Sequence, residues 1–132
     1  MSAVEFSFQA PAPLLSMNDR HHWRKRAELV KAWREAAYYG WWQPPSPRPG
    51  CRCEVAVTLT VRDRRRRDPH NYYPTVKAII DGLVDAGVWP DDTPEWVTTR
   101  EPVLRVGSDR LVIVRLTPAA LRESADTQEA NP

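Results

Sequence analysis

The chain has 132 residues, of which 42% are hydrophobic and 27% are charged. This length and composition are ordinary for one soluble globular domain that buries its core without stabilisation by disulfide bonds or a bound metal. No window approaches the roughly eighteen consecutive apolar residues of a membrane span, and the segment MSAVEFSFQAPAP lacks the pattern of a signal peptide. We therefore expect a cytoplasmic protein with no membrane partner.

Positive charge is concentrated in one part of the chain, although the net charge is only +2. Residues 62–67 carry five arginines and one aspartate, whereas residues 118–132 carry one arginine and three acidic residues. A basic central segment followed by an acidic tail is typical of proteins that contact polyanions. Because the tail also lacks apolar periodicity, we predict a single domain over residues 1–117 and a disordered acidic tail over residues 118–132.

The N-terminal third is predicted to form a strand and a long helix. Residues 4–9 alternate apolar and polar side chains, as in a half-buried strand. Ser16 to Asp19 then supply capping oxygens for a helix of about twenty residues. Its apolar stripe consists of Trp23, Ala27, Val30, Trp33, Ala37 and Trp41. Its other face is basic, with Arg20, Arg24, Lys25, Lys31 and Arg34. That face either lies along a nucleic-acid backbone or is a solvated surface.

The rest of the chain is predicted to add three strands and a second helix. Residues 52–62 alternate in the pattern of a strand, and residues 76–86 form a helix that Gly87 ends. Pro74 fits the first turn of that helix. A strand over residues 96–106 is interrupted at Pro102, and residues 111–116 form the last strand. We therefore expect an α/β (α+β) fold: a small mixed β-sheet of about four strands packed with two main helices.

The residues suited to phosphodiester chemistry lie between Arg62 and Asp92. The run Arg64, Arg65, Arg66 and Arg67 is suited to phosphate binding, because one guanidinium group can donate two parallel hydrogen bonds to two oxygens of a phosphate. Asp68 and His70 follow two residues apart, with side chains on the same side if the chain is extended, and then come Lys77, Asp91 and Asp92. Carboxylates bind hard cations such as Mg²⁺. The alternative is that DPHN and PDD are turns whose acids cap helices, and that Lys77 only pairs with Asp81.

The order of these motifs resembles the Holliday-junction resolvases of the RusA type. The matching segments are RRRRDPHN, the Lys77 to Asp81 pair, and AGVWPDD over residues 86–92. The resemblance extends over about residues 10–117 and is most specific over residues 64–92. It implies a small homodimeric endonuclease, encoded mainly by phages and prophages, that uses Mg²⁺ to make paired nicks across four-way DNA junctions.

The resemblance also implies roles for individual residues. Asp68, His70, Asp91 and Asp92 would hold the metal, and Lys77 would face the scissile phosphate. The DNA backbone would contact Arg64 to Arg67, together with Arg24 and Lys25 on the basic helix. Two features depart from the family: His70 stands where a second aspartate is expected, and Tyr72-Tyr73-Pro74 lengthens the interval before Lys77. Imidazole suits Mn²⁺ and later transition metals better than Mg²⁺, so Mn²⁺ is a second candidate cofactor.

Three other interpretations compete with this one. In the first, the chain binds branched DNA but has lost cleavage through His70. In the second, it is a helix-turn-helix regulator that uses the helix from Arg20 to Arg34, although the longest basic cluster lies outside that helix. In the third, it has a restriction-like nuclease core, but Glu54 and Asp92 lack the lysine expected two residues later.

Overall fold

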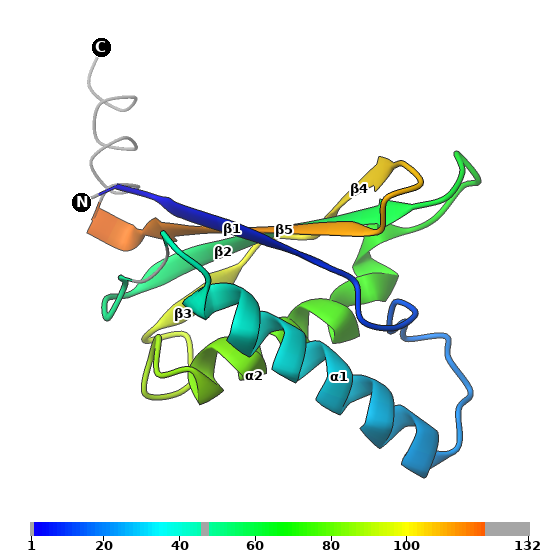
Figure 1. The fold of residues 1–132 in the computed structure, drawn as a ribbon, viewed down its shortest axis with the longest axis horizontal. Helices are drawn as coiled ribbons and strands as arrows, with labels where there is room; N and C mark the ends of the chain where they lie inside the picture. Colours follow the sequence, from blue (N-terminus) through cyan, green and yellow to red (C-terminus); the bar gives the residue numbers. More distant parts are fainter. Residues whose placement is uncertain (1, 46–47, 121–132) are drawn as a thin grey trace.

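The computed structural model describes residues 2–45 and 48–120. It contains a five-stranded mixed sheet with both helices packed on one of its faces, which confirms the predicted α+β class (Figure 1). Within the described residues, no helix combines the length and the apolar character needed to cross a membrane.

Strand β2 (Cys53–Val61) is the centre of the sheet. It pairs antiparallel with β5 (Leu111–Pro118), and β5 pairs antiparallel with the edge strand β1 (Val4–Gln9). The other edge of β2 carries two short parallel strands, β3 (Val97–Thr99) and β4 (Val103–Val106). These two correspond to the single strand predicted over residues 96–106, so the break expected at Pro102 divides it completely and gives five strands rather than four.

Helix α1 (Trp23–Trp42) has the predicted length of twenty residues, but its first turn differs from the prediction. Trp33, Ala37 and Trp41 are buried as expected, whereas Trp23 is 68% exposed. The expected cap was also wrong, because the N-cap is His22, whose Nδ1 accepts a hydrogen bond from the Arg24 amide. The Ser16 to Asp19 segment instead closes its own turn, in which the Ser16 amide donates to the Asp19 carboxylate.

Helix α2 (Tyr73–Asp85) begins three residues earlier than predicted, with Pro74 in its first turn as expected. Gly87 has a φ of 85°, in the left-handed region, and so ends the helix as predicted. Gly82 lets α2 approach α1 closely, because a Cβ at this position would lie 2.3 Å from the Arg34 carbonyl oxygen. The core is formed by this helix pair and the inward faces of β2 and β5.

The last strand extends further than predicted. Strand β5 continues to Pro118, and the Ala119 amide donates a hydrogen bond to the Arg52 carbonyl at 2.8 Å. Residues 118–120 therefore belong to the folded part of the chain and not to a tail. The rest of the predicted tail, residues 121–132, lies outside the described residues.

Candidate functional site

The arginine loop, residues 62–68, follows β2 and is held in shape by Asp63. The Asp63 carboxylate accepts a hydrogen bond from the Arg65 amide at 3.0 Å and forms an ion pair with the Arg67 guanidinium at 3.0 Å. Arg67 also donates to the carbonyl oxygens of Asp63 and Arg65. The amide of Arg65, followed by the Arg67 side chain, lowers the pKa of Asp63 below its ordinary value. Arg67, 12% exposed, therefore organises the loop.

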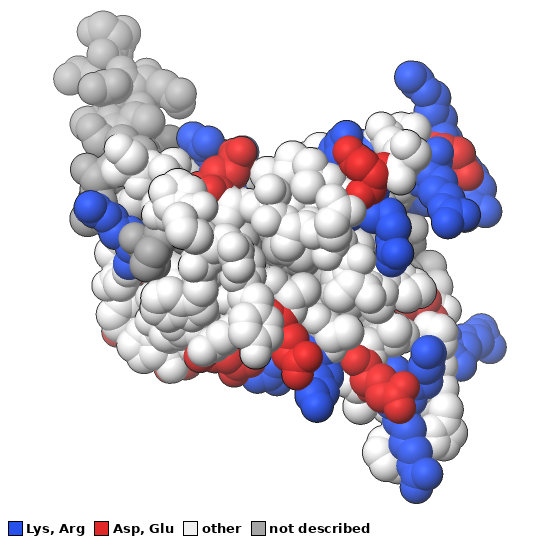
Figure 2. Space-filling model, viewed as in Figure 1, with Lys and Arg blue, Asp and Glu red and all other residues white. Residues whose placement is uncertain are grey.

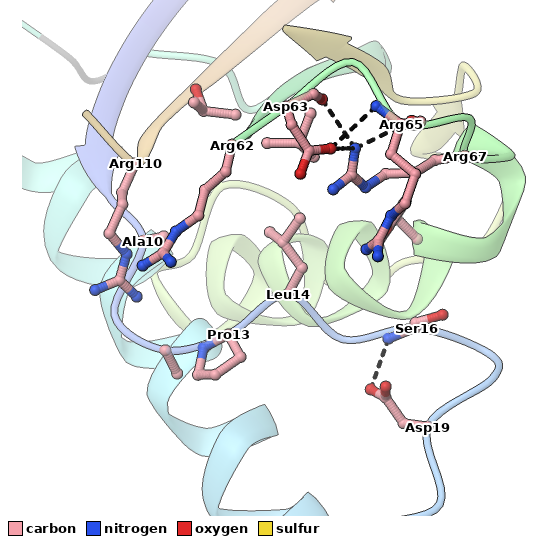
Figure 3. Close-up of a pocket in the computed structure, with 14 residues that line it drawn as sticks. Ala10, Pro13, Leu14, Ser16, Asp19, Arg62, Asp63, Arg65, Arg67 and Arg110 are labelled. Carbon is pink, nitrogen blue, oxygen red and sulfur yellow. Dashed lines mark hydrogen bonds and ion pairs between the residues drawn. The ribbon is translucent and has the colours of Figure 1, made fainter. Parts of the chain in front are cut away.

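A cleft of about 830 Å³ opens beside this loop (Figure 3). We call it the arginine cleft. Its cationic lining comes from two parts of the chain far apart in sequence, the arginine loop and the turn before β5. The charged lining residues are Arg62, Arg65, Arg67, Arg110, Asp19 and Asp63. Four arginines against two aspartates leave the cleft with an excess of positive charge.

Basic side chains gather on two projections of the molecular surface (Figure 2). Comparison with Figure 1 places one projection over the arginine loop and the other over the N-terminal end of α1. The second includes the exposed residues Arg24 and Lys25. There the Arg24 guanidinium lies 5.2 Å from the ring centre of Trp23, which explains how this exposed tryptophan is partly covered.

Asp68 and His70 lie on a turn and not on an extended segment as expected. Residues Pro69–Tyr72 form a short 3₁₀ helix (η1) whose N-cap is Asp68, and the Asp68 carboxylate accepts from the His70 amide at 3.0 Å. Asp68 also lines a hollow of about 210 Å³ together with Arg65, Arg66 and Asn71. Thus the helix-capping alternative is confirmed for one Asp68 oxygen, and the His70 side chain is exposed.

Lys77 brings together two carboxylates that the sequence separates. Its ammonium contacts Asp81 at 2.9 Å, one turn along α2, and also contacts Asp92 in the loop that follows the helix. That loop therefore folds back along α2. The hydrogen bond from Lys77 lowers the pKa of Asp92, and the contact with Asp92, followed by that with Asp81, raises the pKa of Lys77 above its ordinary value. Both groups are charged at neutral pH.

The remaining acids of this region have structural partners. The Asp91 carboxylate accepts from the amide and the hydroxyl of Thr93, at 3.0 and 2.8 Å, so it closes the turn before β3. Asp85 forms a paired contact with Arg34, at 3.0 and 2.8 Å, and thereby links α2 to α1. The turn-forming alternative is therefore confirmed for Asp91 but not for Asp92, whose contact with Lys77 also shows that Lys77 does not pair with Asp81 alone.

The four expected metal ligands do not meet in one cluster. Among residues 2–45 and 48–120, no three Asp, Glu, His or Cys side chains lie close enough together to hold a metal ion. The donor chemistry of Asp68 and Asp92 nevertheless fits a divalent cation. Mg²⁺ commonly takes only one or two carboxylates and completes its shell with water and substrate phosphate. Asp92 already shares one cation, the Lys77 ammonium, with Asp81.

Sequence reasoning missed two contributors to the site. Arg110 lines the arginine cleft from the turn before β5, and Asp63 holds the arginine loop together. The only local signal for Asp63 is its position within the arginine run, and Arg110 has none, because its approach to Arg62 depends on the pairing of distant strands. A comparison with models of known protein families finds no match, and neither does a comparison with curated protein sequences. The function is therefore inferred from the sequence motifs and the geometry of the site.

Proposed function

We propose that the protein is a divalent-metal-dependent endonuclease that cuts branched DNA. The observation that carries this proposal is the contact between Lys77 and Asp92. The motif resemblance implies that these two residues act at one site, although a helix and a loop separate them. The fold brings them together beside the N-terminal half of α2, the end to which η1 delivers Asp68 and His70.

In this site Lys77 would neutralise charge on the scissile phosphate. Its raised pKa keeps it an ammonium at neutral pH, so it serves as a cation and not as a general base. An ammonium has three hydrogen-bond donors, and two are engaged by Asp81 and Asp92. The third is available to a phosphate oxygen. Tyr73 and Lys77 also line a hollow of about 440 Å³ beside β3, where the DNA chain would enter.

Asp68 and Asp92 would hold the metal, with His70 beside them. A bound Mg²⁺ or Mn²⁺ would supply an activated water and stabilise the charge that develops on the phosphate. The turn roles of Asp68 and Asp91 leave each carboxylate a second oxygen, since Asp68 Oδ1 and Asp91 Oδ1 are the atoms that accept the backbone bonds. A carboxylate accepts through both oxygens, so capping a turn is compatible with binding a cation.

The proposed substrate is a four-way DNA junction and the proposed partner is a second copy of the chain. Contacts from arginines to phosphates position DNA without reading its sequence. Specificity for a branch would therefore arise from the geometry of a symmetric homodimer, which presents two sites to two strands of equal polarity.

The test is a nicking assay on a synthetic four-way junction labelled on one strand at a time, with a duplex of the same sequence beside it. We expect paired symmetric nicks with Mg²⁺ or Mn²⁺, none with chelator, and a loss of at least about 100-fold in Asp68→Asn and Asp92→Asn. Asp85→Asn is the matched control, because it removes the same charge at the far end of α2. If Asp85→Asn loses as much activity as the other two, or if no metal supports nicking, the nuclease proposal is wrong.

A second candidate is a branched-DNA-binding protein without cleavage. The observation that favours it is the absence of a three-ligand group among the described residues, together with the engagement of Asp92 by Lys77. It predicts tight junction binding with no nicks under any divalent metal. The same assay therefore distinguishes the two candidates.

A further inference from the structure

We propose that the arginine cleft binds one unpaired strand of DNA, with phosphates on Arg62, Arg65 and Arg110 and with sugars and bases against the segment from Ala10 to Leu14. This inference deepens the proposed function, because it rests on DNA being the substrate. It assigns a site separate from Lys77 and Asp92, neither of which lines the cleft.

The three arginines differ from Arg67 in having uncommitted guanidinium groups. Among the described residues, no hydrogen bond or ion pair engages the side chains of Arg62, Arg65 and Arg110. Figure 3 shows all three extending into the cleft, with Arg62 and Arg110 side by side at one end and Arg65 at the other. Asp63 forms its ion pair with Arg67, and the charge of Arg65 is only the last of the causes that lower the pKa of Asp63. The cleft therefore presents several guanidinium groups that have no hydrogen-bond partner within the described part of the chain, and such groups can each bind one phosphate of a DNA strand.

Hydrogen bonds from Arg105 stabilise the turn that carries Arg110. Arg105 forms two contacts with Asp109, at 2.9 and 3.1 Å, and a third with the Thr60 hydroxyl at 2.9 Å. Arg110 itself has a φ of 56°, in the left-handed region that favours glycine. A left-handed backbone conformation is uncommon for arginine, and residues held in such conformations often lie at ligand sites.

The floor of the cleft is apolar and tied to the core. It includes Ala10, Pro13 and Leu14, and Tyr72 stands at its side. The Ala10 amide donates to the Arg110 carbonyl at 2.9 Å, and the Trp33 indole donates to the Pro13 carbonyl at 3.0 Å. Leu15, the buried residue that follows Leu14, forms two hydrogen bonds with the Thr75 hydroxyl. The floor is thus formed before any ligand binds, and it offers apolar contact to sugars and bases.

The volume of the cleft is compatible with a short stretch of unpaired strand. Its volume of about 830 Å³ is within the range of sites that enclose a small ligand, about 300–1,000 Å³. A few nucleotides of an unpaired strand occupy a space of that order. Charged grooves combined with apolar or aromatic contacts are the usual way in which proteins bind single strands.

The experiment measures fluorescence anisotropy of a labelled oligothymidine against the full chain, in chelator so that no strand is cut, over a series of salt concentrations. We expect Arg62→Ala, Arg65→Ala and Arg110→Gly each to weaken binding about 5- to 10-fold and to reduce the salt slope by about 0.7, the value for one phosphate contact to a single strand. Glycine is chosen at position 110 because it keeps the left-handed turn. Arg110→Lys, which keeps the charge, should lose less.

The matched control is Arg52→Ala, which removes an exposed arginine at the opposite end of β2 from Arg62. Equal losses in Arg52→Ala and Arg62→Ala would overturn the proposal, as would an unchanged salt slope in the three cleft variants or equal losses with a fully paired duplex. Asp92→Asn separates this site from the nuclease site: it should abolish nicking and leave oligothymidine affinity unchanged. In the wild-type protein, by contrast, strand binding without nicking of the junction under any divalent metal would refute the proposed nuclease and support the cleft.

Discussion

The ammonium of Lys77 contacts the carboxylate of Asp92, fifteen residues later in the chain. The loop between α2 and β3 makes this contact possible, because it reverses direction after Gly87 and passes back along the helix. The Trp89 side chain anchors the return, since its indole donates to the Cys51 carbonyl at 2.9 Å and its ring is buried in the core. Packing of one tryptophan therefore determines where an acid of the candidate site lies.

The first prediction concerns the charge of Asp92. Lys77→Gln removes the hydrogen bond that lowers the pKa of Asp92, so this pKa should rise to the ordinary value near 3.8. A lowered pKa in the folded state stabilises the protein above the pKa of the unfolded chain, and that contribution disappears as the pH falls through the folded-state value. The stability difference between wild type and Lys77→Gln should therefore be present at pH 7 and shrink below about pH 4. Carboxyl NMR titration and urea melts measure both effects.

The control for this titration is Asp109, whose pKa is lowered by Arg105. It should be unchanged in Lys77→Gln. A wild-type Asp92 that titrates at the ordinary value would show that the contact with Lys77 does not persist in solution.

The second prediction concerns the metal preference. If His70 flanks the metal, His70→Asp adds a hard oxygen ligand, and the ratio of nicking rates in Mg²⁺ to those in Mn²⁺ should rise about 10-fold or more. His70→Asn has a similar polarity without the carboxylate and should not raise the ratio. The measurement is the nicking rate of a four-way junction in each metal. An equal response to both substitutions would place His70 outside the metal site.

The third prediction concerns the contact between the helices. In an isolated helix, Gly82→Ala would stabilise by about 1 kcal/mol. Here the added Cβ would lie 2.3 Å from the Arg34 carbonyl oxygen, which is backbone, so we expect destabilisation of roughly 1–3 kcal/mol instead. Gly40→Ala is the control, because the three atoms nearest to its Cβ would belong to the side-chain rings of Phe6 and Phe8, at 3.1–3.3 Å, and not to the backbone. In urea denaturation, the free energy of unfolding should be clearly lower for Gly82→Ala than for Gly40→Ala. The reverse order would contradict the close contact between the helices.

The fourth prediction concerns Thr75, which is buried at the first turn of α2. Its hydroxyl donates to the Leu15 carbonyl and accepts from the Leu15 amide, both at 2.8 Å. Thr75→Val keeps the shape but leaves two buried backbone groups unpaired, at a cost of roughly 2–4 kcal/mol. Thr75→Ser keeps the hydroxyl and should cost less than Thr75→Val. Hydrogen exchange at the Leu15 amide should accelerate in Thr75→Val, and unchanged protection would mean that this bond does not hold the cleft floor.

Most of the fold could be predicted from the sequence because it depends on local periodicity. The alternation from Cys53 to Val61 specifies a strand with one buried face, and the apolar spacing from Val76 to Leu83 specifies a helix. Gly87 ends that helix with a positive φ that other residues rarely adopt, and Pro74 fits its first turn because its fixed φ is helical and its missing amide would be unpaired there. Such signals are contained within a few consecutive residues, so they survive without knowledge of the rest of the chain.

Many residues of the candidate site could be named from the sequence, whereas Arg110, Asp63 and the arrangement of the site could not. Acids, a lysine and arginines are visible in the sequence, yet only the tertiary structure shows that Asp92 returns to Lys77 while Asp91 closes a turn. It also shows that Arg67 forms an ion pair with Asp63 and that Arg110 lines the same cleft as Arg62. The sequence by itself therefore determined the elements, since each residue's period and backbone preference are local. The partners of each charge were decided by strand pairing and loop packing between residues far apart in the chain.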